Sequence, residues 1–499
     1  MRADAMLIGE NIHGHAASHP DKPAIICNGE TLSWRDLAQL VDAVSFWLEA
    51  NVPAGCGIAL VMPNSIALPV LVLAIARTGR VAQVFDPAWP DRIVRQTLID
   101  NDSAVVFVAA GRDTRFPESV ELDDRRPLDS LRALYSNTDK NFQPDVSPDA
   151  PFYIGYTSGS TGKPKGYRRS HRSWTESFAI EAVEFGHTTD DVIVAPGSLS
   201  HSLFLYAAIH ALHIGATAVI SRSFRPAQVV AAMQRHTASL LYAVPAQLMM
   251  LAQVPQEQVF SSLRWVISSG SKWRGEDRQI LRRNFPSAGF AEFYGASELS
   301  FVSVAREEES PPPGSVGRAF AGVDIRIVDE AGKSRPAGQT GEVFVRSPMV
   351  FDGYAGGKQQ TGIRRAGDFL SVGDMGCLDD RGFLFLAGRR DRMIVTAGKN
   401  LFPEEIEAVL LNHPGIASAV VVPVEDAKRG ARIAAVLQLQ EGAAVTRSQL
   451  IACAREYLPL YKVPRLYFTV RDWPQTRSGK TDLIALKQRL ADGLCEPLA

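Results

Sequence analysis

The stretch that decides the fold is a run rich in glycine, hydroxyl and lysine side chains: Tyr156-Thr157-Ser158-Gly159-Ser160-Thr161-Gly162-Lys163-Pro164-Lys165-Gly166. Its glycines let the backbone approach a ligand closely, and its amide, hydroxyl and ammonium groups are the donors that phosphate oxygens require. The pattern at Phe152–Tyr156 predicts a strand before it, and a helical pattern begins at about Ser173. We therefore interpret the run as a polyphosphate-binding loop between a strand and a helix, rather than a flexible linker.

Two common phosphate loops are excluded by spacing. The Walker A loop needs four residues between its glycines and Ser or Thr after the lysine, whereas Gly159 and Gly162 are three apart and Pro164 follows Lys163. The dinucleotide fingerprint fails as well, because Gly55 and Gly57 are followed by Leu60 where a third glycine is required.

Length and composition indicate a multidomain globular protein. The chain has 499 residues, a net charge near −1 and 46% hydrophobic residues, so two or more domains are expected, and no charge excess points to nucleic acid or a membrane surface. Its five cysteines are scattered, which suits a reducing compartment and argues against structural zinc. No signal peptide is visible. The longest apolar run, Ile66–Ala76, is too short for a bilayer span, so we expect a buried helix and a cytoplasmic protein.

The order of patterns predicts an α/β fold. Short apolar runs alternate with helical patterns through the first 300 residues or so, which favours a largely parallel sheet. After Pro311–Pro313 the pattern becomes β-rich, and roughly the last hundred residues form an α+β unit. We therefore expect a large N-terminal α/β domain with a β-rich subdomain over residues 1–390 and a small C-terminal domain over residues 391–499, divided within the polar turn at 388–392.

Further short motifs carry groups suited to a nucleotide. A carboxylate such as Glu298 suits Mg²⁺, which prefers oxygen ligands, and the two oxygens of Asp374 can accept both hydroxyls of a sugar. Each motif alone is more typical of a surface turn. In chain order they are Ser269-Gly270-Ser271-Lys272, Tyr294-Gly295-Ala296-Ser297-Glu298, Val372-Gly373-Asp374, Gly388-Arg389 and Pro474-Gln475-Thr476-Arg477-Ser478-Gly479-Lys480.

Together, these motifs resemble those of the adenylate-forming superfamily, which contains acyl-CoA synthetases, peptide-synthetase adenylation domains and luciferases. The resemblance implies that the loop binds the β- and γ-phosphates of ATP through Thr157, Ser158, Gly159, Ser160, Thr161, Gly162 and Lys165. It implies that Gly270, Ser271, Tyr294 and Gly295 surround adenine, that Ser297 contacts phosphate, and that Asp374 and Arg389 bind ribose. It implies Glu298 and Thr161 as Mg²⁺ ligands and Lys480 as the catalytic lysine, with Thr157 and His201 acting beside it.

The same resemblance implies a mobile C-terminal domain that turns about Asp391. Where relatives often carry Glu or an aromatic residue in the thiol tunnel, this chain has Lys399. In α-amino-acid-activating members an Asp binds the substrate ammonium, but here the position holds Ser202, and an unpaired buried ammonium would be costly. His201 instead resembles a residue beside the acyl carboxylate in acyl-CoA synthetases.

The leading hypothesis is an AMP-forming ligase that joins a small, medium or otherwise apolar carboxylic acid to coenzyme A through an acyl-adenylate. A stand-alone ligase that loads an acyl carrier protein, through its phosphopantetheine, is the first alternative. A non-catalytic binding module of the same fold is a second, from a different class. The motifs are shared, so they do not separate the two acceptors, and they do not identify the acid.

Overall fold

The structure is a computed structural model, and it describes most of the chain. The described residues are 7–110, 118–123, 126–134, 141–158, 164–255, 260–270, 275–357, 362–396, 399–426, 430–475 and 481–498. The chain divides into two compact units, one of residues 1–325 with 345–372 and the other of residues 326–344 with 373–499. The sequence predicted a division into residues 1–390 and a mobile domain of residues 391–499. That division stays a prediction.

The first unit contains a seven-stranded sheet that carries the phosphate loop. Five neighbouring strands are parallel, and β8 and β18 continue the sheet in antiparallel fashion at one edge. In spatial order the strands are β18 (Gly353–Tyr354), β8 (Pro164–Ser170), β7 (Pro151–Ser158), β4 (Val81–Val84), β3 (Gly57–Val61), β5 (Ser103–Ala109) and β6 (Ser119–Leu122).

A nine-stranded sheet forms the other half of this unit. Six of its strands, from β13 to β1 in spatial order, are parallel. In spatial order the strands are β15 (Arg318–Ala319), β14 (Ser300–Arg306), β13 (Gly289–Ala296), β12 (Trp265–Ser268), β11 (Leu240–Ala243), β9 (Val192–Ala195), β10 (Thr217–Ile220), β1 (Pro23–Cys27) and β2 (Glu30–Ser33). The two largely parallel sheets confirm the α/β class expected from strand–helix alternation.

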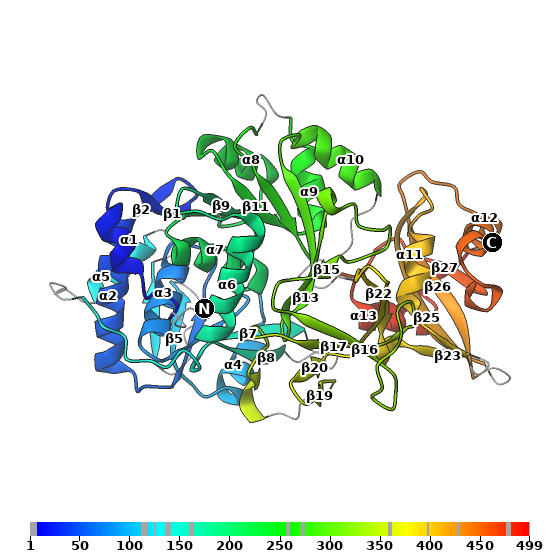
Figure 1. The fold of residues 1–499 in the computed structure, drawn as a ribbon, viewed down its shortest axis with the longest axis horizontal. Coiled ribbons are helices and arrows are strands. Elements are labelled where there is room, and N and C mark those ends of the chain that lie inside the picture. The colour runs from blue at the N-terminus through cyan, green and yellow to red at the C-terminus, as the bar shows by residue number, and fades with distance from the viewer. Residues whose placement is uncertain are drawn as a thin grey trace. The chain divides into compact units, whose positions relative to one another are not determined.

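Helices pack on both sheets and between them (Figure 1). The helix α3 contacts β4 of one sheet and also α7, which packs on β9 and β10 of the other. Every residue of α3 is buried, as expected for a helix that is apolar all round. The helices of this unit are α1 (Ile12–Ser18), α2 (Trp34–Asn51), α3 (Ala67–Arg77), α4 (Asp91–Asp100), α5 (Pro127–Leu134), α6 (His171–Phe185), α7 (Ser202–Ile214), α8 (Pro226–Arg235), α9 (Pro245–Ala252) and α10 (Gly275–Asn284).

One local prediction is wrong. The phosphate loop was expected between a strand and a helix, but it connects the antiparallel strands β7 and β8, and α6 follows only after β8. The strand β8 is not evident from its sequence, Pro164–Ser170, because its composition is polar and three of its seven residues are not fully buried. The loop is therefore the turn of a β-hairpin and not a helix N-terminus.

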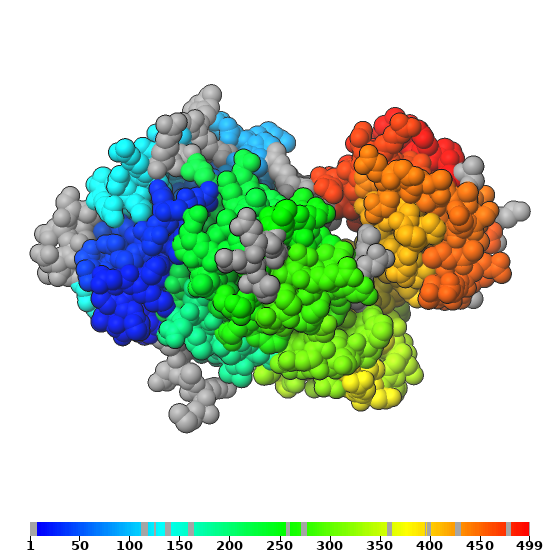
Figure 2. All heavy atoms as spheres, turned by 90° about the horizontal axis from the view of Figure 1, so that it is seen from above, coloured from blue at the N-terminus to red at the C-terminus, as the bar shows by residue number. Residues whose placement is uncertain are grey.

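The second unit has a four-stranded sheet with helices on both faces. Alternate residues of its central strands pack against α11 and α12 on one face and against α13 on the other, as the strand period of two requires. From residue 394 onward, the elements of this unit are β23 (Ile394–Thr396), β24 (Lys399–Leu401), α11 (Pro403–Leu410), β25 (Ile416–Asp426), β26 (Gly430–Leu439), α12 (Arg447–Tyr457), β27 (Leu466–Thr469), α13 (Leu483–Ala491) and β28 (Glu496–Pro497). In Figure 2, the atoms of these elements are coloured from yellow-orange to red.

The remaining strands are short and antiparallel. Within the second unit, β17 pairs with β21 and β21 pairs with β22; within the first, β19 pairs with β20. Their bounds are β16 (Asp324–Val328), β17 (Gly341–Arg346), β19 (Arg364–Ala366), β20 (Phe369–Ser371), β21 (Asp374–Leu378) and β22 (Leu384–Arg389). Among the described residues, none of the helices has the length and apolar character that crossing a bilayer requires.

Candidate active site

The phosphate loop is positioned by the register of its hairpin. Thr157 on β7 lies opposite Lys165 on β8, and Ser158 lies opposite Pro164. Thr157 and Lys165 are both half-buried, so the two ends of the loop present a hydroxyl and an ammonium group together. The predicted contacts from Gly159, Ser160, Thr161 and Gly162 lie outside the described residues.

The Tyr294–Glu298 motif begins within β13 and continues into the turn that leads to β14. Tyr294 lies opposite Ser303, and Gly295 lies opposite Phe301 after a bulge in the register. A Cβ atom on Gly295 would lie 2.1 Å from the Ser300 carbonyl oxygen, so the hairpin closes this tightly only with glycine at that position. This close approach fixes where Tyr294 and the turn after it lie.

Glu298 is connected to the phosphate hairpin by Tyr354, a residue that the sequence did not single out. The Tyr354 hydroxyl donates to Glu298 Oε1 at 2.7 Å, and the ammonium of Lys165 lies 5.8 Å from the centre of the Tyr354 ring, within reach of a cation–π contact. Tyr354 is also opposite Tyr167 of β8. The structure therefore brings the predicted phosphate and Mg²⁺ residues together.

A buried arginine, Arg169, holds the turn that contains Glu298. Arg169 of β8 is 4% exposed, and its guanidinium donates to the carbonyl oxygens of Ser297 at 3.3 Å and Met349 at 2.8 Å. It also donates to Ser173, through the side-chain and carbonyl oxygens. Burial lowers the pKa of Arg169. No sequence pattern identifies Arg169 as part of the site, because Ser297 and Met349 lie 128 and 180 residues away from it in the chain.

The loop after β12 is held beside the same motif. Ser268 of β12 is in register with Glu292 of β13, and the Ser269 hydroxyl donates to the Phe293 carbonyl oxygen at 3.0 Å. Gly270 follows with φ of +101°, a backbone conformation that favours glycine. Both loops leave the carboxyl ends of parallel strands, where ligands of such sheets usually bind. Ser271 lies outside the described residues.

His201 is the residue immediately before α7. The loop that leads to it is held by Asn64, whose amide nitrogen donates to the carbonyl oxygens of Gly197 and Ser221, both at 2.8 Å. The Asn64 amide oxygen accepts from the Leu199 backbone N–H at 2.8 Å. Asn64 is buried, so a residue from a distant segment determines where His201 lies.

The predicted ribose pair is adjacent within the second unit. Asp374 of β21 and Arg389 of β22 are register partners, and Arg389 Nε lies 3.7 Å from Asp374 Oδ1 and 3.5 Å from Asp391 Oδ1. Arg389 is 48% exposed and the Asp374 side chain 13% exposed. Lys480 lies outside the described residues, so its catalytic role stays a prediction.

Comparison with known families identifies the chain. The AMP-binding enzyme family matches residues 12–355, and the AMP-binding enzyme C-terminal domain matches residues 405–480. The protein belongs to the AMP-binding enzyme family. This confirms its membership of the adenylate-forming superfamily, in the acyl-CoA synthetase branch.

Full-length relatives of this AMP-binding enzyme agree with that placement. It is 35% identical to an uncharacterised acyl-CoA ligase of Bacillus subtilis, YhfT, over 98% of this chain and 99% of that protein. It is 31% identical to indoleacetate–CoA ligase of Aromatoleum aromaticum over 97% of this chain and 98% of that protein. The ATP-bound crystal structure of MatB from Rhodopseudomonas palustris superposes with a TM-score of 0.87 at 25% identity, covering 98% and 99% of the two chains. ATP is therefore supported as the nucleotide.

Proposed function

We propose that this AMP-binding enzyme is an AMP-forming acid–thiol ligase that activates a carboxylic acid with ATP and transfers the acyl group to CoA. The observation that carries the proposal is the link between the phosphate hairpin and the Glu298 turn, made by Tyr354 and Arg169. That link brings hydroxyl, ammonium and carboxylate groups close together, and this grouping supports the binding of a metal-bound polyphosphate.

In the first step the acid carboxylate attacks the α-phosphate of ATP, and pyrophosphate leaves. The hairpin residues Thr157 and Lys165, with the intervening loop, hold the β- and γ-phosphates and stabilise the leaving group. Ser297 contacts phosphate, and Tyr294 with the Gly270 loop encloses adenine. Lys480 bridges the carboxylate and the α-phosphate as negative charge develops between them.

The residues present fit a magnesium ion. Glu298 Oε1 accepts the Tyr354 hydrogen bond, and a carboxylate has a second oxygen with which to coordinate a cation. We assign Glu298 and Thr161 as the protein ligands. When bound, the ion neutralises phosphate charge. Tyr354 orients the carboxylate toward it.

In the second step a thiol displaces AMP from the acyl-adenylate. His201, at the start of α7, lies beside the acyl carboxylate in this proposal, and Asp374 and Arg389 retain the ribose. We propose that residues 391–499 rotate about Asp391 between the two steps, since hinge residues at element ends absorb such changes. The acid is small, medium or otherwise apolar, and it is not an α-amino acid, because Ser202 supplies no countercharge for an ammonium group.

A pyrophosphate-release assay with a panel of carboxylic acids, ATP and CoA tests the function. We expect release that depends on one class of acid, formation of its CoA thioester, and loss of both in Lys480→Ala. An unchanged rate in Lys480→Ala would refute the role of that lysine, and absence of acid-dependent release with every acid would support a non-catalytic module.

The acyl acceptor is tested separately. The same motifs occur in ligases that load a carrier protein, so each active acid is offered with CoA and then with a phosphopantetheinylated carrier. A CoA thioester supports the leading proposal, whereas transfer to the carrier alone would support the stand-alone carrier-loading ligase. We also propose a cytoplasmic location, which the five free cysteines suit.

A further inference from the structure

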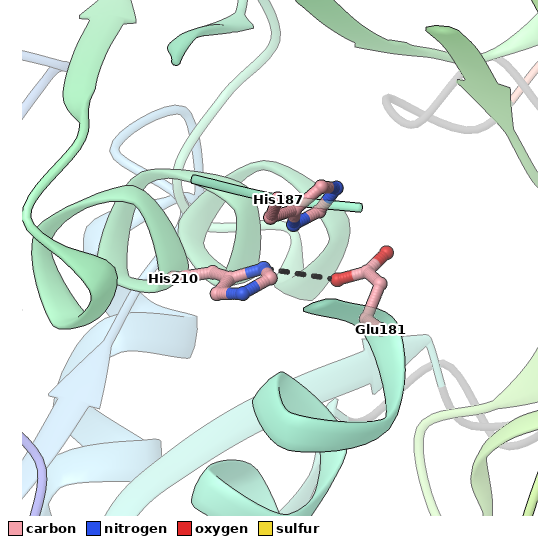
Figure 3. A group of neighbouring side chains, drawn as sticks. All are labelled: Glu181, His187 and His210. Carbon is pink, nitrogen blue, oxygen red and sulfur yellow. Dashed lines mark ion pairs between the residues drawn. The ribbon is translucent and has the colours of Figure 1, made fainter. Parts of the chain in front are cut away.

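Three potential metal ligands meet inside the first unit, away from the motifs assigned above. They are Glu181 of α6, His187 in the segment after it, and His210 of α7, called here the His–Glu cluster. Their ligand atoms all lie within 4.8 Å of one another. Figure 3 shows the His210 ring directed at the Glu181 carboxylate, with His187 beside both, and His210 Nδ1 lies 3.0 Å from Glu181 Oε2.

The cluster is buried, and its histidine rings lack hydrogen-bond partners of regular geometry. The side chains of Glu181 and His210 are 0% exposed. Among the described residues, the ring nitrogens of His187 and His210 make no hydrogen bond of regular geometry, while the Glu181 carboxylate lies within hydrogen-bond reach of the Tyr206 and Tyr242 hydroxyls. Buried polar groups nearly always have a partner, and leaving them without one is costly. A group of this kind therefore requires an explanation.

The side-chain types and their spacing suit coordination. Two imidazole rings and a carboxylate, with ligand atoms within 4.8 Å of one another, can reach one cation together. Burial raises the pKa of Glu181, while His187 and the hydroxyls of Tyr242 and Tyr206 act against that rise. A cation that binds here would displace any proton on the carboxylate, as metal binding generally does.

The surroundings orient the ligands and exclude water. Phe178 stacks on His210 with ring centres 4.7 Å apart and planes at 5°, and Phe185 stacks on His187 at 5.9 Å. Such outer contacts fix the ring orientation of metal ligands. The charge of Arg264, which acts on His187, is neutralised by Asp191 at 2.9 Å.

We propose that Glu181, His187 and His210 bind one divalent transition-metal cation of the zinc type. Two imidazoles and one carboxylate form a recognised ligand set for Zn²⁺, whereas Mg²⁺ prefers oxygen ligands and retained waters. The ion joins the end of α6, the segment after it and α7, the helix whose N-terminus follows His201. Cysteine spacing argued against structural zinc, but this set contains no cysteine and its members meet only in the folded chain.

The test measures metal content of the full-length protein produced in zinc-supplemented medium and freed of loosely bound ions by brief chelation. We expect about one equivalent of zinc per chain, and in cobalt-grown protein the visible absorption of a bound Co²⁺ ion. The variant His187→Gln changes the least buried ligand, so it is the one best tolerated by the fold. It should lose at least about tenfold in bound metal.

The matched control is His213→Asn. His213 lies on the same helix as His210 and also packs on Phe178, but it is not a member of the cluster. Zinc content should stay at the wild-type value in this variant. Wild-type protein without zinc, or equal zinc content in the His187→Gln and His213→Asn variants, would overturn the proposal and leave a metal-free polar cluster.

Discussion

The Tyr294–Glu298 turn and the Asp374–Arg389 pair are proposed to hold two parts of one nucleotide, yet their supports differ. The turn is held by Arg169 and Tyr354, a buried cation and a hydroxyl from distant segments. The pair is held by neighbouring strands of one hairpin, and Arg389 is 48% exposed. Changes around the turn should therefore affect stability and activity together, whereas changes in the pair should affect activity alone.

The largest effect is expected for Arg169→Met. Removal of the buried guanidinium leaves the carbonyl oxygens of Ser297 and Met349 without their donor, and losing such a charged hydrogen-bonding group costs about 3 kcal/mol. Denaturant titration should show this loss in unfolding free energy, with reduced pyrophosphate release. The control Arg168→Met changes the exposed neighbour on the same strand. An equal loss of unfolding free energy in both variants would contradict the supporting role of the buried Arg169.

Acid should destabilise the first unit through His171. This side chain is buried, its Nδ1 accepts from the Ile8 backbone N–H at 3.0 Å, and burial lowers its pKa to about 4. The unfolded chain binds the proton at about 6.5, so its stabilising contribution is complete above that pH and is lost as pH falls toward 4. The expected loss is about 1.4 kcal/mol for each pH unit in this window.

Unfolding free energies at pH 7 and pH 5 check the sign. His171→Gln should reduce the slope by about 1.4 kcal/mol for each pH unit, since the neutral amide has no proton to take up while the other buried histidines remain. An unchanged slope in His171→Gln would show that other groups determine the acid sensitivity.

A smaller effect is expected for Tyr354→Phe. It removes one hydrogen bond to a carboxylate, worth about 1.5 kcal/mol, and frees Glu298 to adopt other orientations. We expect a higher Mg²⁺ requirement in pyrophosphate release, measured by metal titration. The matched control Tyr457→Phe removes a hydroxyl bonded to Glu456 on the surface of α12. Identical Mg²⁺ curves for Tyr354→Phe and wild type would argue against the orienting role.

The smallest effect on stability is expected for Asp374→Asn. Its contact with Arg389 spans 3.7 Å and is partly exposed, so the unfolding free energy should change by less than about 1 kcal/mol. The KM for ATP should nevertheless rise, because the amide replaces one acceptor oxygen by a donor. A large loss of stability with an unchanged KM would make the pair structural and remove its proposed ribose role.

Much of the fold was predictable because the strands and helices differ in period. Short apolar runs were expected as strands in the first 300 residues or so, where β9 and β12 lie, and the β-rich pattern after Pro313 contains β17. The strand β8 was missed because Lys165, Arg168 and Arg169 make it polar, and its pairing with β7 outweighs its composition. The loop composition led to the phosphate-binding hypothesis, which stays a prediction, whereas the position of the loop between two paired strands was known only from the sheet.

The sequence by itself determined the α/β class, because this follows from the local alternation of strand and helix patterns, and its motifs gave the family and the candidate residues of the nucleotide site through their resemblance to the adenylate-forming superfamily. Only the tertiary structure decided which residues support them. Arg169, Tyr354 and Asn64 reach partners across long stretches of chain, and the His–Glu cluster unites two helices with the segment between them. Such contacts leave no local pattern, because their energy depends on burial and on the approach of distant backbone.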